Sequence, residues 1–194
     1  MPGCNRLKIL MLVISLCIFT LACVKSQPSS LSSIDNPVTA KDWYNKGAAL
    51  MGFSKYQDAI RAFQKSVELD PKYVESWKGM GICYSALENF DEAAAAFDKA
   101  TALDPEDADT WHEKGLALVE AGRLEEAVQA FTGALELYPN DPGWWMDKGD
   151  TLNRLGRTAE AEECYKRAKQ RINDIEKLLD KPLKEQLQDY KQQK

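Results

Sequence analysis

Histidine is the residue type that this sequence most nearly lacks, because His112 is the only one among 194 residues. A histidine-based metal cluster and a relay between two histidines are therefore excluded. Neither Cys-x-x-Cys nor His-Glu-x-x-His, the spacings that commonly hold zinc, occurs anywhere in the chain. We expect no metal site and no cofactor.

The motifs of nucleotide chemistry and of acid-base catalysis are also missing. Gly79-Met80-Gly81 lacks the later Gly-Lys-Ser/Thr of a phosphate loop. Carboxylate pairs at 91–92, 125–126 and 162–163 lie beside apolar helix positions, so we interpret them as solvated outer faces. The sequence therefore predicts no catalytic residues, no small-molecule substrate and no enzyme activity.

Positive charge is outnumbered, with 25 Lys and Arg against 30 Asp and Glu and a net charge of -5. A nucleic-acid backbone would be repelled on average by such a protein. Cysteine is scarce in the part expected to fold, where only Cys83 and Cys164 occur, in different repeats. Because this is no disulfide framework, we interpret both as small core residues.

Long hydrophobic runs are absent except at the N-terminus, where residues 9–24 are apolar. This run falls short of the roughly 20 residues that cross a bilayer as a helix. Arg6 and Lys8 precede it, and the first acidic residue is Asp35. A basic start, a short apolar stretch and a small residue at its end are typical of a secretory signal, which we assign to residues 1–22.

The apolar run ends in Leu21-Ala22-Cys23, which resembles the lipobox of bacterial and some archaeal lipoproteins. The resemblance implies cleavage before Cys23, lipidation of Cys23 and a membrane-anchored, extracytoplasmic protein. Two other interpretations stay open: a plain signal whose cleavage secretes the protein, and an uncleaved helical anchor. Residues 23–39 are rich in serine with two prolines and no helical or strand period, which predicts a flexible linker.

The rest of the chain is periodic, since Trp43, Trp77, Trp111 and Trp145 are each 34 residues apart. A fixed period of this length is the signature of a solenoid of repeated units. Other columns share the spacing: Gly47, Gly81, Gly115 and Gly149; Ala59, Ala93, Ala127 and Ala161; Phe63, Phe97, Phe131 and Tyr165; Ser66, Ala100, Ala134 and Ala168; and Pro71, Pro105 and Pro139.

These columns resemble the tetratricopeptide repeat (TPR), W-x2-L-G-x2-Y, A-x3-F-x2-A, P. The resemblance implies an all-α, right-handed superhelix in which two helices, A and B, make each repeat, with repeats at 40–73, 74–107, 108–141 and 142–175. We expect the small alanine of helix B to meet the glycine of helix A. The expected helices span 40–53, 56–69, 74–87, 90–103, 108–121, 124–137 and 142–155.

The fourth repeat differs, because Asn173 stands where the other repeats have proline. Its helix B should therefore run from 158 to 180, until Lys181-Pro182 interrupts it. A short helix over 183–192 should follow, and we expect the tail 176–194 to cap the open end of the stack. A partner-binding tail is the alternative. The expected capping residues are Leu178, Leu179, Leu183, Leu187 and Tyr190.

In this family, helix A lines the concave face, and repeat positions 2, 5, 9, 12 and 13 usually contact a segment of a partner protein. Carried over residue by residue, the predicted contacts are Lys41, Tyr44, Met51, Glu75, Lys78, Ile82, Asp109, His112, Leu116, Val119, Met146, Asp150, Asn153 and Arg154. Apolar side chains among them, rimmed by both charge signs, suit an amphipathic segment.

One TPR subtype is excluded, the carboxylate clamp that grips chaperone C-termini. Its basic and amide positions are occupied here by Tyr44, Ala48, Gly79, Asp109 and Glu113. We therefore expect a non-catalytic, membrane-tethered scaffold that binds a protein or peptide segment of unknown identity. The alternative is a structural subunit that assembles as a homo-oligomer, or a regulatory module of a membrane-associated complex.

Overall fold

The structure of the protein, a computed structural model, describes the backbone of residues 37–192 and the side chains of residues 37–177. All described helices lie in the compact unit Thr39–Lys194. Of the other unit, Met1–Val38, only Pro37 and Val38 are described. The expected signal, Cys23 and most of the linker therefore lie outside the described residues.

The described part of the chain is all helical, which confirms the predicted fold class. Helix B of the first three repeats has the predicted ends, and helix A ends one residue earlier than expected in each repeat. The helices are α3 (Ala40–Gly52), α4 (Tyr56–Leu69), α5 (Val74–Ala86), α6 (Phe90–Leu103), α7 (Ala108–Glu120), α8 (Leu124–Leu137), α9 (Pro142–Arg154) and α10 (Thr158–Gln192).

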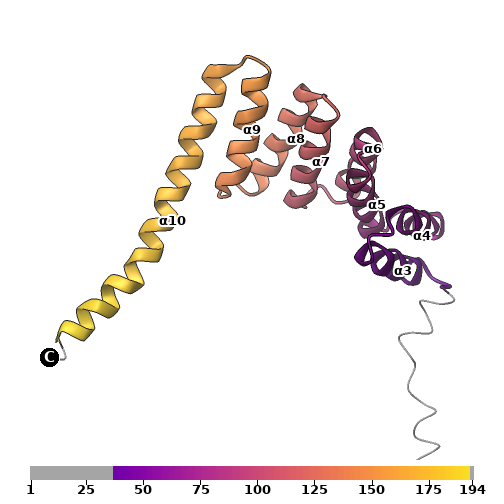
Figure 1. The fold of residues 1–194 in the computed structure, drawn as a ribbon, viewed down its shortest axis with the longest axis horizontal. Helices are drawn as coiled ribbons and strands as arrows, with labels where there is room; N and C mark the ends of the chain where they lie inside the picture. The colour runs from indigo at the N-terminus through magenta and orange to yellow at the C-terminus, as the bar shows by residue number, and fades with distance from the viewer. Residues whose placement is uncertain (1–36, 193–194) are drawn as a thin grey trace, which may run out of the picture. The chain divides into compact units, whose positions relative to one another are not determined.

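The helices pack in chain order. Each helix A packs on helix B of its own repeat, and each helix B of the first three repeats also packs on the next helix A. Figure 1 shows the successive pairs side by side from α3 to α10. This serial packing is that of a solenoid, in which each repeat contacts its neighbours.

The aromatic column fills the space between the two helices of a repeat, and the ring of Phe63 also lies against Gly79 of the next repeat. Phe63, Phe97 and Phe131 are fully buried, as are the alanines of the neighbouring columns. The expected neighbour of the glycine of helix A is the alanine of helix B, but the atoms nearest to that glycine belong to the aromatic ring: a methyl group added to Gly81 would lie 2.6 Å from the ring of Phe97. The glycine is therefore needed because a phenyl ring lies directly on its Cα.

The proline column connects one repeat to the next. The indole nitrogen of Trp77 donates a hydrogen bond to the carbonyl of Pro71 over 3.0 Å. The same 3.0 Å bond joins Trp111 to Pro105 and Trp145 to Pro139. Because proline stops helix B as predicted and its carbonyl holds the following tryptophan, the column sets both the end of one repeat and the start of the next.

The predicted break at Pro182 is wrong, because α10 continues from Thr158 to Gln192 without interruption. A proline removes one helical hydrogen bond, and here it lies among leucine, lysine, glutamate and glutamine, which favour helix strongly. The extended helix packs mainly on α9. The side chains expected to cap the stack, Leu178 onward, lie outside the described side chains.

Candidate protein-binding face

The fourteen predicted contact residues all come from α3, α5, α7 and α9, and we call them the helix-A face. Within residues 37–192, no helix is both long and apolar enough to cross a bilayer. No group of histidine, cysteine, aspartate or glutamate side chains among the described residues is arranged to hold a metal ion.

The fifth position of each of the first three repeats is engaged within the fold. The ring of Tyr44 packs on Tyr73 at the end of its repeat, with 5.4 Å between centroids. Lys78 forms an ion pair with Asp107, the residue that precedes α7. Tyr73 and Asp107 are each the last residue of a repeat and immediately precede the next helix A. The two contacts therefore hold the junction with the following repeat, and Lys78 is already neutralised by its partner.

Asp107 also caps the N-terminus of α7. Its carboxylate accepts hydrogen bonds from the backbone nitrogen of Thr110 over 3.3 Å and from the Thr110 hydroxyl over 2.7 Å. Partial burial favours a raised pKa for Asp107, but the hydrogen bonds from Lys78 and Thr110 outweigh it and hold the pKa below its ordinary value. The contacts with Lys78 and Thr110 therefore stabilise the ionised form of the Asp107 carboxylate.

His112 lies in an aromatic cluster that sequence reasoning missed. Its ring stacks on Trp144 with 4.9 Å between centroids and lies 5.4 Å from the ring of Phe131. Tyr138 packs edge-on against Trp144. His112 Nε2 is 2.7 Å from a carboxylate oxygen of Asp147. With only 15% of its side chain exposed, His112 serves packing between α7 and α9. The available signal was Trp144, the one tryptophan outside the 34-residue column.

Three apolar side chains of the helix-A face remain open to solvent. Ile82 is 41% exposed, Leu116 37% and Met146 46%. Met51 and Val119 instead pack against the cores of their repeats and are half-buried. The accessible apolar strip, as we call Ile82, Leu116 and Met146, is therefore narrower than the predicted one.

Apart from Lys78 and His112, the polar side chains of the helix-A face are exposed, and they include three carboxylates and two basic groups. Asp150 accepts a 2.7 Å hydrogen bond from the hydroxyl of Tyr165, which raises the pKa of that tyrosine. With Lys78 paired, the exposed acidic residues outnumber the exposed basic ones on this face. The exposed polar residues are Lys41, Glu75, Asp109, Asp150, Asn153 and Arg154.

Both cysteines of the repeats are buried free thiols, as the sequence predicted. Burial raises the pKa of Cys83 to about 11, and burial is also the main cause of the raised pKa of Cys164. Thiols with raised pKa values are poor nucleophiles at neutral pH, because the thiolate is the reactive form. Their contribution is to packing.

Comparison with known proteins agrees with the repeat architecture. A TPR family model described as "Cilia and flagella-associated protein 70 C-terminal domain" matches residues 22–187. No curated protein sequence matches the chain. A crystal structure of MamA superimposes with a TM-score of 0.69 at 22% identity, covering 74% of this chain and 84% of MamA. MamA from Desulfovibrio magneticus RS-1 superimposes with a TM-score of 0.65 at 22% identity, covering 70% and 76%. At these identities the likeness concerns the fold.

Proposed function

Because the chain belongs to the TPR family of the cilia and flagella-associated protein 70 C-terminal domain, we propose that it is a non-catalytic scaffold that binds a segment of a partner protein on the helix-A face. The observation that carries the proposal is the accessible apolar strip. Ile82, Leu116 and Met146 expose apolar side chains from three successive repeats, whereas the fifth-position side chains of the first three repeats are held within the fold.

The surroundings of the strip define the chemistry of the segment. Three separated apolar side chains suit an amphipathic helix or an extended segment that inserts its own apolar residues between them. The acidic residues around the strip favour basic residues beside those anchors, since complementary charge raises the rate of association. We therefore infer a partner segment with about three apolar anchors and a basic flank.

Tethering to a membrane outside the cytoplasm is the second part of the proposal. Its support is the sequence: the basic start, the apolar residues 9–24, the Leu-Ala-Cys ending at Cys23 and the serine-rich linker. A lipid on Cys23 would hold the repeats at the membrane surface. Mass spectrometry of the N-terminal peptide tests the lipid, because a lipidated Cys23 is expected and an unmodified peptide would overturn lipidation. Membrane fractionation tests the tether, because a chain recovered only in the soluble fraction would overturn it.

The binding proposal is tested by affinity capture from detergent-solubilised membranes of the native host. Leu116→Glu places a charge in the accessible apolar strip and should abolish capture of the partner. Leu103→Glu is the matched control, because Leu103 is 38% exposed but lies on α6, outside the helix-A face. Capture that survives Leu116→Glu, or that is lost equally in both variants, would overturn the assignment to this face.

A self-assembling structural subunit is the second candidate, favoured by Ile172 and Ile175, which are exposed on α10. Such an exposed apolar pair could pack against another copy of the helix. Sedimentation of the full chain in detergent across micromolar concentrations separates the two candidates. A mass that stays that of one chain would reject self-assembly, whereas a concentration-dependent mass that Ile172→Glu abolishes would support it.

A further inference from the structure

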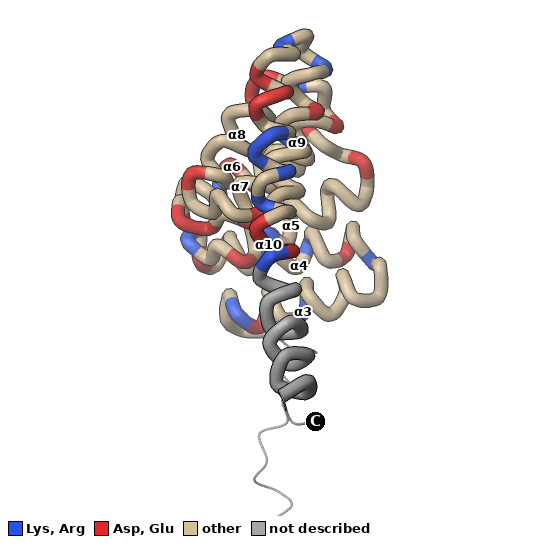
Figure 2. The backbone as a smooth tube through the Cα atoms, turned by 90° about the vertical axis from the view of Figure 1, so that its left-hand side faces the viewer, with Lys and Arg blue, Asp and Glu red and all other residues tan. Residues whose placement is uncertain are grey.

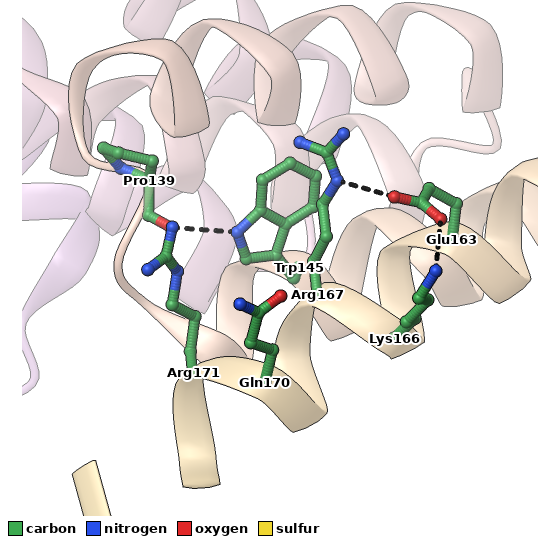
Figure 3. A pocket seen from close by; sticks show the side chains of 7 residues that line it. All are labelled: Pro139, Trp145, Glu163, Lys166, Arg167, Gln170 and Arg171. Atoms are coloured by element: carbon green, nitrogen blue, oxygen red, sulfur yellow. Dashed lines mark hydrogen bonds and ion pairs between the residues drawn. The ribbon is translucent and has the colours of Figure 1, made fainter. Parts of the chain in front are cut away.

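A cavity of about 290 Å³ lies between the start of α9 and the middle of α10, away from the helix-A face. Its walls are Trp145 with the carbonyl side of Pro139, and the residues of α10 that face them. Figure 3 shows the side chains of α10 rising around the indole ring, with Arg171 on the side of Pro139 and Glu163 on the other. The cavity is open to solvent, so a ligand can enter it.

The cavity is cationic in a protein whose net charge is negative. Lys166, Arg167 and Arg171 line it against a single carboxylate, that of Glu163. Figure 2 shows lysine and arginine positions following one another along this part of α10. Three positive side chains and one negative one leave two positive charges unmatched. A fully ionised phosphate monoester carries two negative charges and would balance them.

The side chains are already partly positioned. The guanidinium of Arg167 lies over the indole of Trp145, 4.8 Å from its centroid, and its Nε donates a 3.1 Å hydrogen bond to Glu163. Stacking of this kind holds a guanidinium at modest entropic cost and leaves its other N–H groups free to donate. Trp145 is itself fixed by its hydrogen bond to Pro139.

Arg171 is the side chain left to bind a ligand. Among the described residues it forms no ion pair or hydrogen bond, although it is half-buried against the cavity. A planar guanidinium can donate two parallel hydrogen bonds to one phosphate. Arg171 therefore supplies a strong donor pair that the fold itself does not use.

The other repeats show that the solenoid does not need these cations. The residues that occupy the position of Arg171 in the first three repeats are Leu69, Leu103 and Leu137. The cavity of repeat three beside Trp111 is lined by three carboxylates, those of Glu125, Glu126 and Glu136, against two cations, Lys114 and Arg157. The cavity beside Trp43 in repeat one also carries three cations against Asp58, those of Lys46, Arg61 and Lys65. There, however, Arg61 is paired with Asp58 and Lys65 with Glu68. What distinguishes the cavity of repeat four is therefore Arg171, which no carboxylate among the described residues neutralises.

We propose that this cavity binds a phosphate monoester group, held by Arg171, Arg167 and Lys166 beside the indole of Trp145. The same group occurs as free phosphate and as the headgroup of phosphatidic acid. Because the cavity is open to solvent, the glycerol and acyl chains of the lipid could extend out of it. The site uses none of the helix-A face, so it stands independently of the partner-binding proposal.

The indole N–H signal of Trp145 in the nitrogen-15 NMR spectrum of the full chain in detergent reports binding directly. It is identified by its loss in Trp145→Phe. Inorganic phosphate should shift this signal and leave those of the other four tryptophans in place. Acetate, a monoanion, should need at least about tenfold higher concentration, because it matches only one of the two unmatched charges.

Arg171→Leu is the test variant, because leucine occupies this position in the other three repeats and the fold accommodates it. It should weaken phosphate binding about tenfold, the effect of losing one charge-assisted contact. Lys169→Leu is the matched control, since it removes the same charge from α10 outside the cavity, and it should weaken binding less than about twofold.

Dihexanoylphosphatidic acid distinguishes the two sources of the group. Tighter binding than that of inorganic phosphate supports a lipid headgroup, and equal binding supports free phosphate. The proposal is overturned if no shift of Trp145 occurs, if acetate binds as well as phosphate, or if Lys169→Leu and Arg171→Leu weaken binding equally.

Discussion

The first three repeats and the fourth share the tryptophan, glycine, alanine and aromatic columns, but the fourth lacks the proline and buries its aromatic residue less. Phe131 is fully buried, whereas Tyr165 in the same column is half-buried and turns its hydroxyl to Asp150. Helix B spans 14 residues in α4, α6 and α8 but 35 in α10. In the first three repeats a proline ends helix B, and the next helix A covers its remaining face. The fourth repeat has neither the proline nor a following helix A among the described residues, so its helix B continues and keeps an exposed face.

The largest expected difference between repeats three and four is in their aromatic core residue. Phe131→Ala should lower the free energy of unfolding by about 3–5 kcal/mol, because it leaves a cavity in a fully buried core. Tyr165→Ala should cost less than half as much, because part of that ring already faces water. Urea unfolding measures both, and equal losses would mean that the end repeat is as well packed as the inner one.

Replacing the glycines that contact these rings should also cost more stability in repeat three than in repeat four, with smaller losses than those of the aromatic substitutions. A methyl group at Gly115 would lie 2.5 Å from the ring of Phe131, and one at Gly149 would lie 2.7 Å from that of Tyr165. Gly115→Ala should cost about 1–3 kcal/mol through overpacking, and Gly149→Ala less, because Tyr165 can move toward solvent.

Gly52→Ala is the control for these two substitutions, since nothing lies within 4 Å of a methyl group there. It should leave the unfolding midpoint unchanged or raise it slightly. A loss as large as that of Gly115→Ala would show that the helix, and not the ring contact, is sensitive to the change.

The link between repeats two and three should depend on pH. Asn caps helices as well as Asp does, so Asp107→Asn should keep the cap of α7 and lose the ion pair with Lys78, at a cost of about 1 kcal/mol at pH 7. Because the folded-state pKa of Asp107 lies below its ordinary value of 3.8, its charge stabilises the fold above that pH. The contribution is lost as pH falls through the folded-state pKa.

Asp141→Asn is the control at the following junction, since Asp141 caps α9 through Gly143 and Trp144. No ion pair of Asp141 occurs among the described residues. Thermal unfolding at pH 7 should separate the two variants, with Asp141→Asn close to the parent protein. A difference between Asp107→Asn and the parent that persists unchanged at pH 2 would contradict the role of the ion pair.

The smallest expected effect is in thiol labelling. Cys83 and Cys164 should react with iodoacetamide at pH 8 more than tenfold more slowly than glutathione does, because both thiols are buried and their pKa values are raised, that of Cys83 to about 11. Cys164 should be labelled before Cys83, because the end repeat opens more readily. Mass spectrometry of the two peptides measures the order of labelling. Faster labelling of Cys83 would contradict the expectation that the end repeat opens more readily than the second repeat.

Most of the repeat architecture could be predicted from the sequence because its period is long and its columns are chemically distinct. Tryptophan, glycine and proline each have one role in the first three repeats, so their spacing located the ends of α3 to α9 to within a residue. The predicted break at Pro182 was wrong because the strongly helix-forming residues around it outweigh the effect of one proline. The break in the leucine column at Arg171 was visible in the sequence, but its meaning required the cavity beside Trp145.

The helix-A face was harder to predict at the level of single residues. The repeat positions of Tyr44, Lys78 and His112 indicate that they point toward the concave side, which does not reveal whether a neighbouring repeat already holds them. Their partners Tyr73 and Asp107 lie in the junctions that precede α5 and α7, and Trp144 lies in the first turn of α9, outside the 34-residue columns. Only Ile82, Leu116 and Met146 combine the expected position with an exposed apolar side chain.

The most direct test of partner binding on the helix-A face is photo-crosslinking in the native host, with a photoreactive amino acid at position 116 in one protein and at position 103 in another. The two sites have nearly equal exposure, 37% and 38%. We expect position 116 to crosslink to a protein other than this chain and position 103 not to. Crosslinking of that protein from position 103 alone, or from neither position, would contradict binding on the accessible apolar strip.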